Sequence, residues 1–458
     1  MSKRGIAAGM LCLCAFLCSC NSTGSGEENK TEYPVITFVY PGNVRRQENA
    51  ETAEAAINEI LRERIGAEIR LKGITGSDYA AEFRETVAMN EPFDIAIATG
   101  NSYSENMMIG SFLDISELIE EYGKGILETV GRDVVGAMKQ DTHLYGIPNI
   151  RDYAVTTDTY VLNLEILERN LIDFDSIQTM EDLESAMEQI HAAEPDTMIM
   201  ASESDSFIGN TYYAASSFEY PIGVLEDQGQ GDRYINYFRT QEYKELLERV
   251  RRWYENGWIK ARIEGSEVVK ESGEELVDVR YGKPDVNQEV SRYNGGSPYR
   301  ALSFGRDVIT HGTYQLCVLT VSAGAKDPQL CMKILNEFYT DAEINRQLKT
   351  LLFSWNVPNL FLTDPADTSP RNLWELYERF NADAVKAKDL AFNFDYTPVI
   401  KEYIEVAKIY DRYRPLLENG LVEVESTLAA MNEEMDQAGI EDIVEEKNRQ
   451  YEIWKNRN

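Results

Sequence analysis

Histidine and cysteine are scarce in this 458-residue chain. The three histidines, His143, His191 and His311, are far apart, and none stands in a spacing that is typical of zinc sites. Two of the six cysteines, Cys317 and Cys331, lie outside the first 20 residues. Each lies in an apolar segment. The two residues are therefore expected either to form one disulfide or to be buried free thiols. We expect no metal site and no cofactor.

Positive charge is also in short supply. The chain has 45 Lys and Arg against 78 Asp and Glu, a formal net charge of −33. Nucleic-acid binders need clustered basic residues, so this balance predicts no nucleic-acid partner. An anionic membrane would also repel the chain, so any membrane attachment needs another cause. A single core stops growing at roughly 250–300 residues, so the length predicts at least two lobes.

The N-terminus supplies a membrane attachment. Lys3 and Arg4 precede an apolar segment that is too short to span a bilayer, as in a signal peptide. The sequence LCSC that ends at Cys20 resembles the lipobox of bacterial lipoproteins. This resemblance implies that residues 1–19 are removed and that Cys20 is diacylated and anchors the protein. The alternative is an ordinary signal peptide cleaved elsewhere. Residues 21–32 are polar and predict a flexible tether.

Strands and helices alternate after the tether. Apolar runs predict strands over 36–42, 67–74 and 93–100, and helical spacing predicts helices over 51–65 and 79–89. This order favours a parallel sheet covered by helices, in which ligands bind at the carboxyl ends of the strands. Tyr40, Asn101 and Tyr103 follow two of these strands and are therefore ligand candidates.

A second unit begins near residue 149. Residues 156–163 predict a strand, and Thr179 predicts the N-cap of a helix with Asp182 at its third position. The segment 263–299 is rich in Gly, Ser and charge and predicts a long crossover between lobes. Further expected elements are a helix over 240–254, a strand over 313–321 and helices over 328–339, 399–413 and 440–454. No segment after residue 20 is long and apolar enough to span a bilayer.

Several short motifs carry a family resemblance. After the lipobox come FDIAIATG, LYGIPN, TYVLNLEIL, TMEDL, WYENGWI and GAKDPQLCMKILNEFYTD, in that order. In this order they make the chain resemble the family 1 extracellular solute-binding proteins, the lipid-anchored receptors of bacterial ABC importers. Residues 391–403 and 438–454 are similar to the subgroup that has an added C-terminal domain of unassigned function.

The resemblance implies an α/β fold: a two-lobed, periplasmic-binding-protein-like fold of type II, in which each lobe is a sheet flanked by helices. A helical C-terminal extension completes it. The expected divisions are a signal peptide over 1–19, the lipidated Cys20 and tether over 20–32, lobe 1 over 33–148, lobe 2 over 149–304, a return segment to lobe 1 over 305–360, and a C-terminal helical region over 361–458 that packs on lobe 2.

The resemblance also implies a function. A monomeric protein on the outer face of the cell membrane would capture a small solute, most simply a carbohydrate or oligosaccharide, by hinge closure and deliver it to the permease subunits of an ABC importer. It would not be an enzyme. Sugar sites need aromatic platforms and polar hydrogen-bonding groups. The candidates that meet this need are Tyr40, Asn101, Tyr103, Arg151, Asp152, Tyr212, Tyr213, Trp355 and Asp395.

Alternatives stay open at this point. Asp395 precedes Pro398 and is also a good helix cap. Aromatic sites also suit peptides. A surface carbohydrate-active hydrolase needs only two carboxylates, which an acidic chain always offers. A ligand-sensing lipoprotein that feeds a sensor kinase would share the same fold and anchor.

Overall fold

A computed structural model describes residues 33–75, 78–89, 91–140, 142–202, 206–208, 220–264, 267–270, 275–279, 283–293 and 295–456. Pro34–Asn458 forms one compact unit. The predicted lipidation site Cys20 and the candidates Tyr212 and Tyr213 lie outside the described residues. None of the helices in the described ranges combines the length and apolar character needed to cross a bilayer.

The first lobe is built on a five-stranded sheet in the order β2-β1-β3-β15-β4. As the alternation predicted, β1 pairs in parallel with β2 and with β3. The predicted strand over 313–321 is only half right, because its first residues form the helix α12 and the strand begins at Val318. The strands are β1 (Val35–Pro41), β2 (Glu68–Ile74), β3 (Ile95–Ala98), β4 (Ile147–Pro148) and β15 (Val318–Val321).

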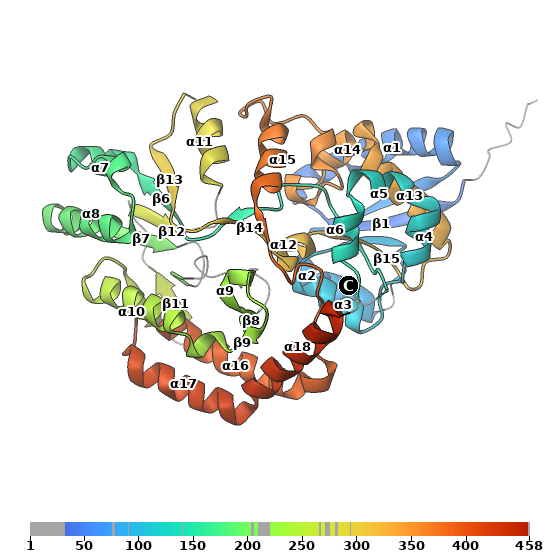
Figure 1. The fold of residues 1–458 in the computed structure, drawn as a ribbon. Coiled ribbons are helices and arrows are strands. Elements are labelled where there is room, and N and C mark those ends of the chain that lie inside the picture. Colours follow the sequence, from blue (N-terminus) through green and yellow to red (C-terminus); the bar gives the residue numbers. More distant parts are fainter. Residues whose placement is uncertain are drawn as a thin grey trace, which may run out of the picture. The chain divides into compact units, whose positions relative to one another are not determined.

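Helices surround this sheet (Figure 1). Buried strand residues such as Phe38 and Ile97 share one core with Ile57 of α1 and Phe338 of α13. The helices of this lobe are α1 (Ala50–Ile65), α2 (Tyr79–Ala88), α3 (Asn101–Met108), α4 (Ser116–Tyr122), α5 (Lys124–Thr129), α6 (Arg132–Ala137), α12 (His311–Gln315), α13 (Pro328–Thr340), α14 (Ala342–Lys349) and α15 (Leu373–Asp383).

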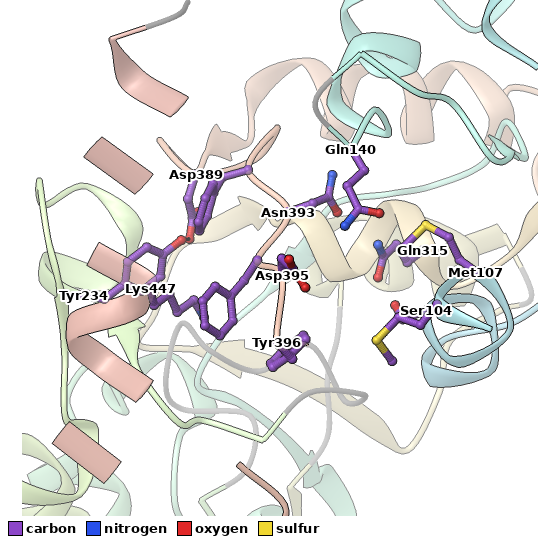
Figure 2. Close-up of a pocket in the computed structure, with 13 residues that line it drawn as sticks. Ser104, Met107, Gln140, Tyr234, Gln315, Asp389, Asn393, Asp395, Tyr396 and Lys447 are labelled. Carbon is purple, nitrogen blue, oxygen red and sulfur yellow. Dashed lines mark hydrogen bonds between the residues drawn. The ribbon is translucent and has the colours of Figure 1, made fainter. Parts of the chain in front are cut away.

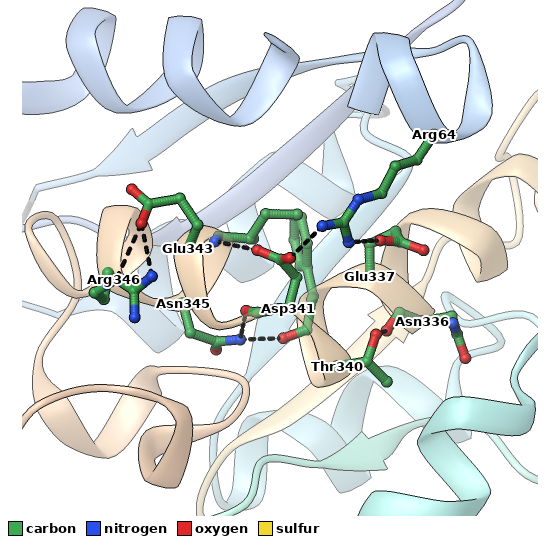
Figure 3. Close-up of polar contacts among 10 residues, drawn as sticks. Arg64, Asn336, Glu337, Thr340, Asp341, Glu343, Asn345 and Arg346 are labelled. Carbon is green, nitrogen blue, oxygen red and sulfur yellow. Dashed lines mark hydrogen bonds and ion pairs between the residues drawn. The ribbon is translucent and has the colours of Figure 1, made fainter. Parts of the chain in front are cut away.

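Asp341 joins three helices of this lobe (Figure 3). Its side chain accepts a hydrogen bond from the Ile344 backbone N–H at 2.7 Å and so caps α14. Its other carboxylate oxygen lies 2.7 Å from the guanidinium of Arg64 on α1. Arg64 also pairs with Glu337 of α13 at 2.7 Å. Asp341 therefore caps α14 and, through Arg64, ties α1, α13 and α14 together.

The second lobe has a four-stranded sheet in the order β13-β6-β12-β7. Thr179 and Asp182 form the predicted capping box of α8. The expectation of a crossover over 263–299 is wrong, since β12 lies in the interior of this sheet, between β6 and β7. The elements are β6 (Thr159–Asn163), β7 (Met198–Ser202), β10 (Ala261–Glu264), β11 (Glu267–Lys270), β12 (Glu275–Val279), β13 (Tyr299–Ser303), α7 (Leu164–Arg169), α8 (Met180–Ala193) and α10 (Gln241–Glu255). The helix α11 (Pro284–Tyr293) lies between β12 and β13 in the sequence, but its buried residue Val286 belongs to the first core.

One small sheet lies where the chain passes between the two cores. Its strands are β5 (Val155–Thr156), β14 (Asp307–Ile309) and β16 (Val385–Lys386), with β14 in the middle. Ala154, Ile309 and Ala384 belong to the first core. Tyr160, Leu302 and Val399 belong to the second.

The C-terminal region that we expected on lobe 2 is divided between the cores. Leu373 and Phe380 of α15 pack in the first core. The helices α16 (Ile400–Leu417), α17 (Val424–Ala438) and α18 (Ile440–Lys455) contribute Val406, Met431 and Ile443 to the second. A third, small cluster joins α18 to the short strands β8 (Val224–Leu225) and β9 (Tyr234–Ile235), with Phe392 among its members.

Candidate functional site

A cavity of about 80 Å³ lies where lobe 1 faces the segment 389–396 and α18 (Figure 2). Lobe 1 lines one side with neutral groups, and the C-terminal region, together with Tyr234 of β9, lines the other with aromatic and charged ones. The lobe 1 residues are Ser104, Met107, Met108, Gln140 and Gln315. Facing them are Tyr234, Asp389, Phe392, Asn393, Phe394, Asp395, Tyr396 and Lys447.

Hydrogen bonds hold the segment 389–396 from both sides. The Gln450 side chain of α18 accepts a hydrogen bond from the Asp395 backbone N–H and donates one to the Asp395 carbonyl, each 2.9 Å. On the lobe 1 side, the Asn393 amide donates to the Lys139 carbonyl at 2.8 Å. The Asp395 carboxylate accepts from the Thr397 backbone N–H at 2.9 Å. The cavity wall formed by this segment is therefore fixed before any ligand binds.

At the far end of the cavity, the ammonium of Lys447 packs against the rings of Tyr234 and Phe394. The Tyr234 hydroxyl donates to the Asp389 carboxylate at 2.7 Å. The Lys447 ammonium lies 4.4 Å from the centre of the Tyr234 ring and 5.7 Å from that of Phe394. It also donates to the Gly223 carbonyl at 2.9 Å. These contacts orient both rings through cation–π attraction.

The lining suits a ligand that has both apolar faces and hydroxyl groups. Aromatic rings pack against apolar C–H faces, while amides and carboxylates bind hydroxyls. A cavity of about 80 Å³ has room for roughly five to eight waters, which is about the space of one sugar ring.

Asp395 is the one predicted candidate with a described side chain that lines this cavity. Its capping role, the alternative interpretation, is also present, through the hydrogen bond from Thr397. Tyr40 is fully buried against Phe38, with ring centres 5.8 Å apart, and burial raises its pKa. Tyr103 is 1% exposed and stacks on Phe112. Both rings therefore pack in the lobe 1 core.

Arg151 and Asp152 form an ion cluster just before the first crossing strand. Asp152 lies 3.1 Å from the Arg151 guanidinium and 2.7 Å from the ammonium of Lys283, which precedes α11. Burial opposes ionisation of Asp152, but the charges of Arg151 and Lys283 outweigh it and hold the Asp152 pKa below its usual value. This cluster does not line the cavity.

Two further candidates lie elsewhere in lobe 1. Trp355 is 41% exposed and stacks on Phe353, with ring centres 6.3 Å apart. Asn101 is the first residue of α3. The predicted candidates whose side chains the structure describes are thus not gathered into one site.

Sequence reasoning missed most of the cavity lining. Ser104, Gln140 and Gln315 are ordinary polar residues, and nothing in their local sequence marks them. Tyr396 had a usable signal, because it directly follows Asp395 in the aromatic-polar segment NFDY.

Comparisons with known proteins place this geometry in context. Residues 389–456 match the family described as "Domain of unknown function (DUF3502)". A curated protein of Streptococcus pneumoniae named "Carbohydrate ABC transporter substrate-binding protein" is 21% identical over an alignment of 491 positions that covers 98% of each chain. The N-glycan transport solute binding protein of S. pneumoniae superposes with a TM-score of 0.78 at 20% identity, over 93% of this chain and 100% of that one. This chain has the fold of the two-lobed solute-binding proteins.

A second structure agrees on the fold. An extracellular solute-binding protein from Bifidobacterium longum subsp. infantis superposes with a TM-score of 0.60 at 14% identity, over 92% of this chain and 99% of that one. The predicted family resemblance and the predicted α/β two-lobed fold are thereby confirmed. The match to DUF3502 defines the C-terminal domain as residues 389–456, a name kept below.

Proposed function

We propose that this protein is a lipid-anchored extracellular solute-binding protein that captures a carbohydrate by hinge closure and delivers it to the permease of an ABC importer. The observation that carries the proposal is the fold match over 93% of the chain to a solute-binding protein of N-glycan transport. The curated relative, named for carbohydrate ABC transport, matches over 98% of the chain and supports the same function.

The three crossing strands support the closure step. Domain closure requires that a few residues between two rigid bodies absorb the change in backbone angles. β5, β14 and β16 are two or three residues long, and they join two separate cores. A rotation localised to this small sheet would bring the lobes together around a solute while both cores stay packed.

The chemistry of the cavity supports a neutral carbohydrate as the solute. Its lining combines aromatic rings, neutral amide groups and negatively charged carboxylates. Two structures of the S. pneumoniae N-glycan transport protein, described as complexes with Man1GlcNAc and with Man5GlcNAc, superpose on this chain with TM-scores of 0.68 and 0.67. Mannose-containing glycans are therefore the first solutes to test.

A thermal-shift screen tests the solute class. The panel is Man1GlcNAc, Man5GlcNAc, maltotriose, tri-N-acetylchitotriose and a neutral tripeptide. A sugar present at 100 times its Kd stabilises the folded state by about 2.7 kcal/mol, which raises the Tm by roughly 3 °C in a chain of this size. Stabilisation by the peptide alone would refute the carbohydrate proposal. Reducing-end release on a catalytic timescale would favour the hydrolase instead.

The proposed lipid anchor at Cys20 is tested by membrane fractionation. Cys20→Ala removes the thiol that the lipobox resemblance assigns to the lipid, so the variant should leave the membrane fraction for the soluble one. Cys18→Ala changes a neighbouring cysteine and should stay in the membrane fraction. Membrane association of the Cys20→Ala protein that requires detergent for release would refute the anchor. Delivery to a permease predicts that deleting the gene abolishes uptake of the stabilising sugar by whole cells.

A further inference from the structure

We propose that the C-terminal domain has a direct part in solute recognition: its segment 389–396 forms one wall of a subsite for a single neutral sugar ring. The other wall belongs to lobe 1. This inference rests on the proposed function, because it assigns part of the solute contact to a domain whose role is unassigned.

The two walls come from distant parts of the chain. Ser104 and Gln140 belong to lobe 1, whereas Asp395 and Tyr396 belong to the C-terminal domain, more than 250 positions later in the sequence. Figure 2 shows Asp395 between Gln315 on the lobe 1 side and Lys447 on α18. A ligand in this cavity therefore touches both regions at once.

Asp395 carries the polar part of the inference. Its Oδ1 accepts the hydrogen bond from Thr397. Within the described part of the chain, its Oδ2 has no hydrogen-bond donor, so it remains available to a ligand hydroxyl. Hydrogen bonds to a charged group contribute more than those between neutral groups. The two hydrogen bonds with the Gln450 side chain, one accepted and one donated by it, fix the Asp395 backbone, so little entropy is lost when a hydroxyl binds.

Aromatic rings supply the apolar part. The Tyr396 ring lies 4.8 Å from that of Phe394 and 4.5 Å from that of Tyr403, measured between ring centres. These contacts hold the ring in one orientation and leave it half-buried at the cavity wall. A fixed, partly exposed ring is the platform that the C–H face of a sugar requires.

The charge of the cavity lining favours neutral sugars over anionic ones. Among the described residues that line the cavity, two are carboxylates, Asp389 and Asp395, and one is an ammonium, that of Lys447. An anionic sugar or a sugar phosphate would meet net negative charge here, and like charges repel. A neutral ring is therefore the preferred occupant. Because the cavity has room for about one ring, the subsite would hold one unit of an oligosaccharide.

The experiment is isothermal titration calorimetry with Man5GlcNAc, Man1GlcNAc, maltotriose and tri-N-acetylchitotriose. Asp395→Asn keeps the Thr397 cap, since Asn caps as well as Asp, but removes the charge. We expect its Kd for the bound sugar to rise about tenfold. Ser104→Trp fills the cavity from the lobe 1 side and should weaken binding at least tenfold.

One control variant should bind within twofold of wild type: Asp367→Asn, which changes an exposed carboxylate outside the cavity. All variants should unfold within 2 °C of wild type, in line with ordinary surface substitutions.

The outcomes separate the two proposals. If the wild type binds none of the sugars, both the proposed function and the subsite are wrong. If the wild type binds a sugar and neither Asp395→Asn nor Ser104→Trp weakens it, the subsite is wrong and the proposed function stands. If only Ser104→Trp weakens binding, lobe 1 contacts the solute and the contribution of the C-terminal domain is refuted.

Discussion

Replacing Asp341 with Ala should destabilise lobe 1 by an amount that the structure divides into two parts. Loss of the α14 cap removes the 2.7 Å hydrogen bond from Ile344 and costs about 1 kcal/mol. Loss of the 2.7 Å ion pair with Arg64 costs less, since the Arg64 side chain is 46% exposed although that of Asp341 is only 10% exposed. We assign about 0.5–1 kcal/mol to it. The expected total is about 1.5–2 kcal/mol.

Urea unfolding of a matched series measures both parts. Asp341→Asn keeps a capping oxygen but loses the charge, so it should lose only about 0.5–1 kcal/mol of unfolding free energy. Salt should reduce this ion-pair part and leave the cap part unchanged, because salt screens exposed charges. The reasoning is refuted if Asp341→Asn costs as much as Asp341→Ala, or if 1 M NaCl removes the whole effect of the Ala substitution.

Three further predictions concern other contacts. Thr179→Ala breaks the capping box of α8 and should cost about 1 kcal/mol in urea unfolding; an unchanged midpoint would contradict it. Burial raises the pKa of Asp114, but hydrogen bonds, led by the Ser116 hydroxyl, outweigh it and lower the pKa to about 2. Its stabilisation should be complete above about pH 4 and lost as pH falls to about 2, so the stability gap to Asp114→Asn should close in that window. Burial raises the pKa of Cys317 to about 12, and Cys331 is a buried free thiol too. Ellman's reagent should label both only after unfolding, and labelling of the native protein would contradict this.

Local signals in the sequence predicted the elements that local interactions determine. Apolar periodicity located α1, α10 and α18 to within a residue or two, and the Thr179 cap was predicted from two residues. β12 was missed because the acidic residues Glu275 and Asp278 flank its buried pair Leu276 and Val277 and interrupt the apolar run. Its strand character comes from its partners β6 and β7, which lie far away in the sequence.

The candidate site was harder to predict for the same reason. Tyr40 and Tyr103 do follow strands, as the pattern indicated, but position after a strand does not determine whether a ring faces solvent or the core. Both face the core. The cavity depends on the approach of α3 to the segment 389–396, a contact that no local pattern encodes. Only Asp395 was predicted, because its own segment is unusual in composition.

The hydrogen bond from Asn393 to the Lys139 carbonyl affects how far the lobes can separate. Asn393 lies seven residues beyond the crossing strand β16, and the helices that follow it are packed into the second core. Lys139 belongs to lobe 1. The bond therefore ties the two bodies together at a point outside the crossing strands, and wide opening must break it or pull the segment 389–396 away from α18. Under the proposed hinge closure, the C-terminal domain would limit the opening movement, and weakening this bond should favour the open, solute-free form.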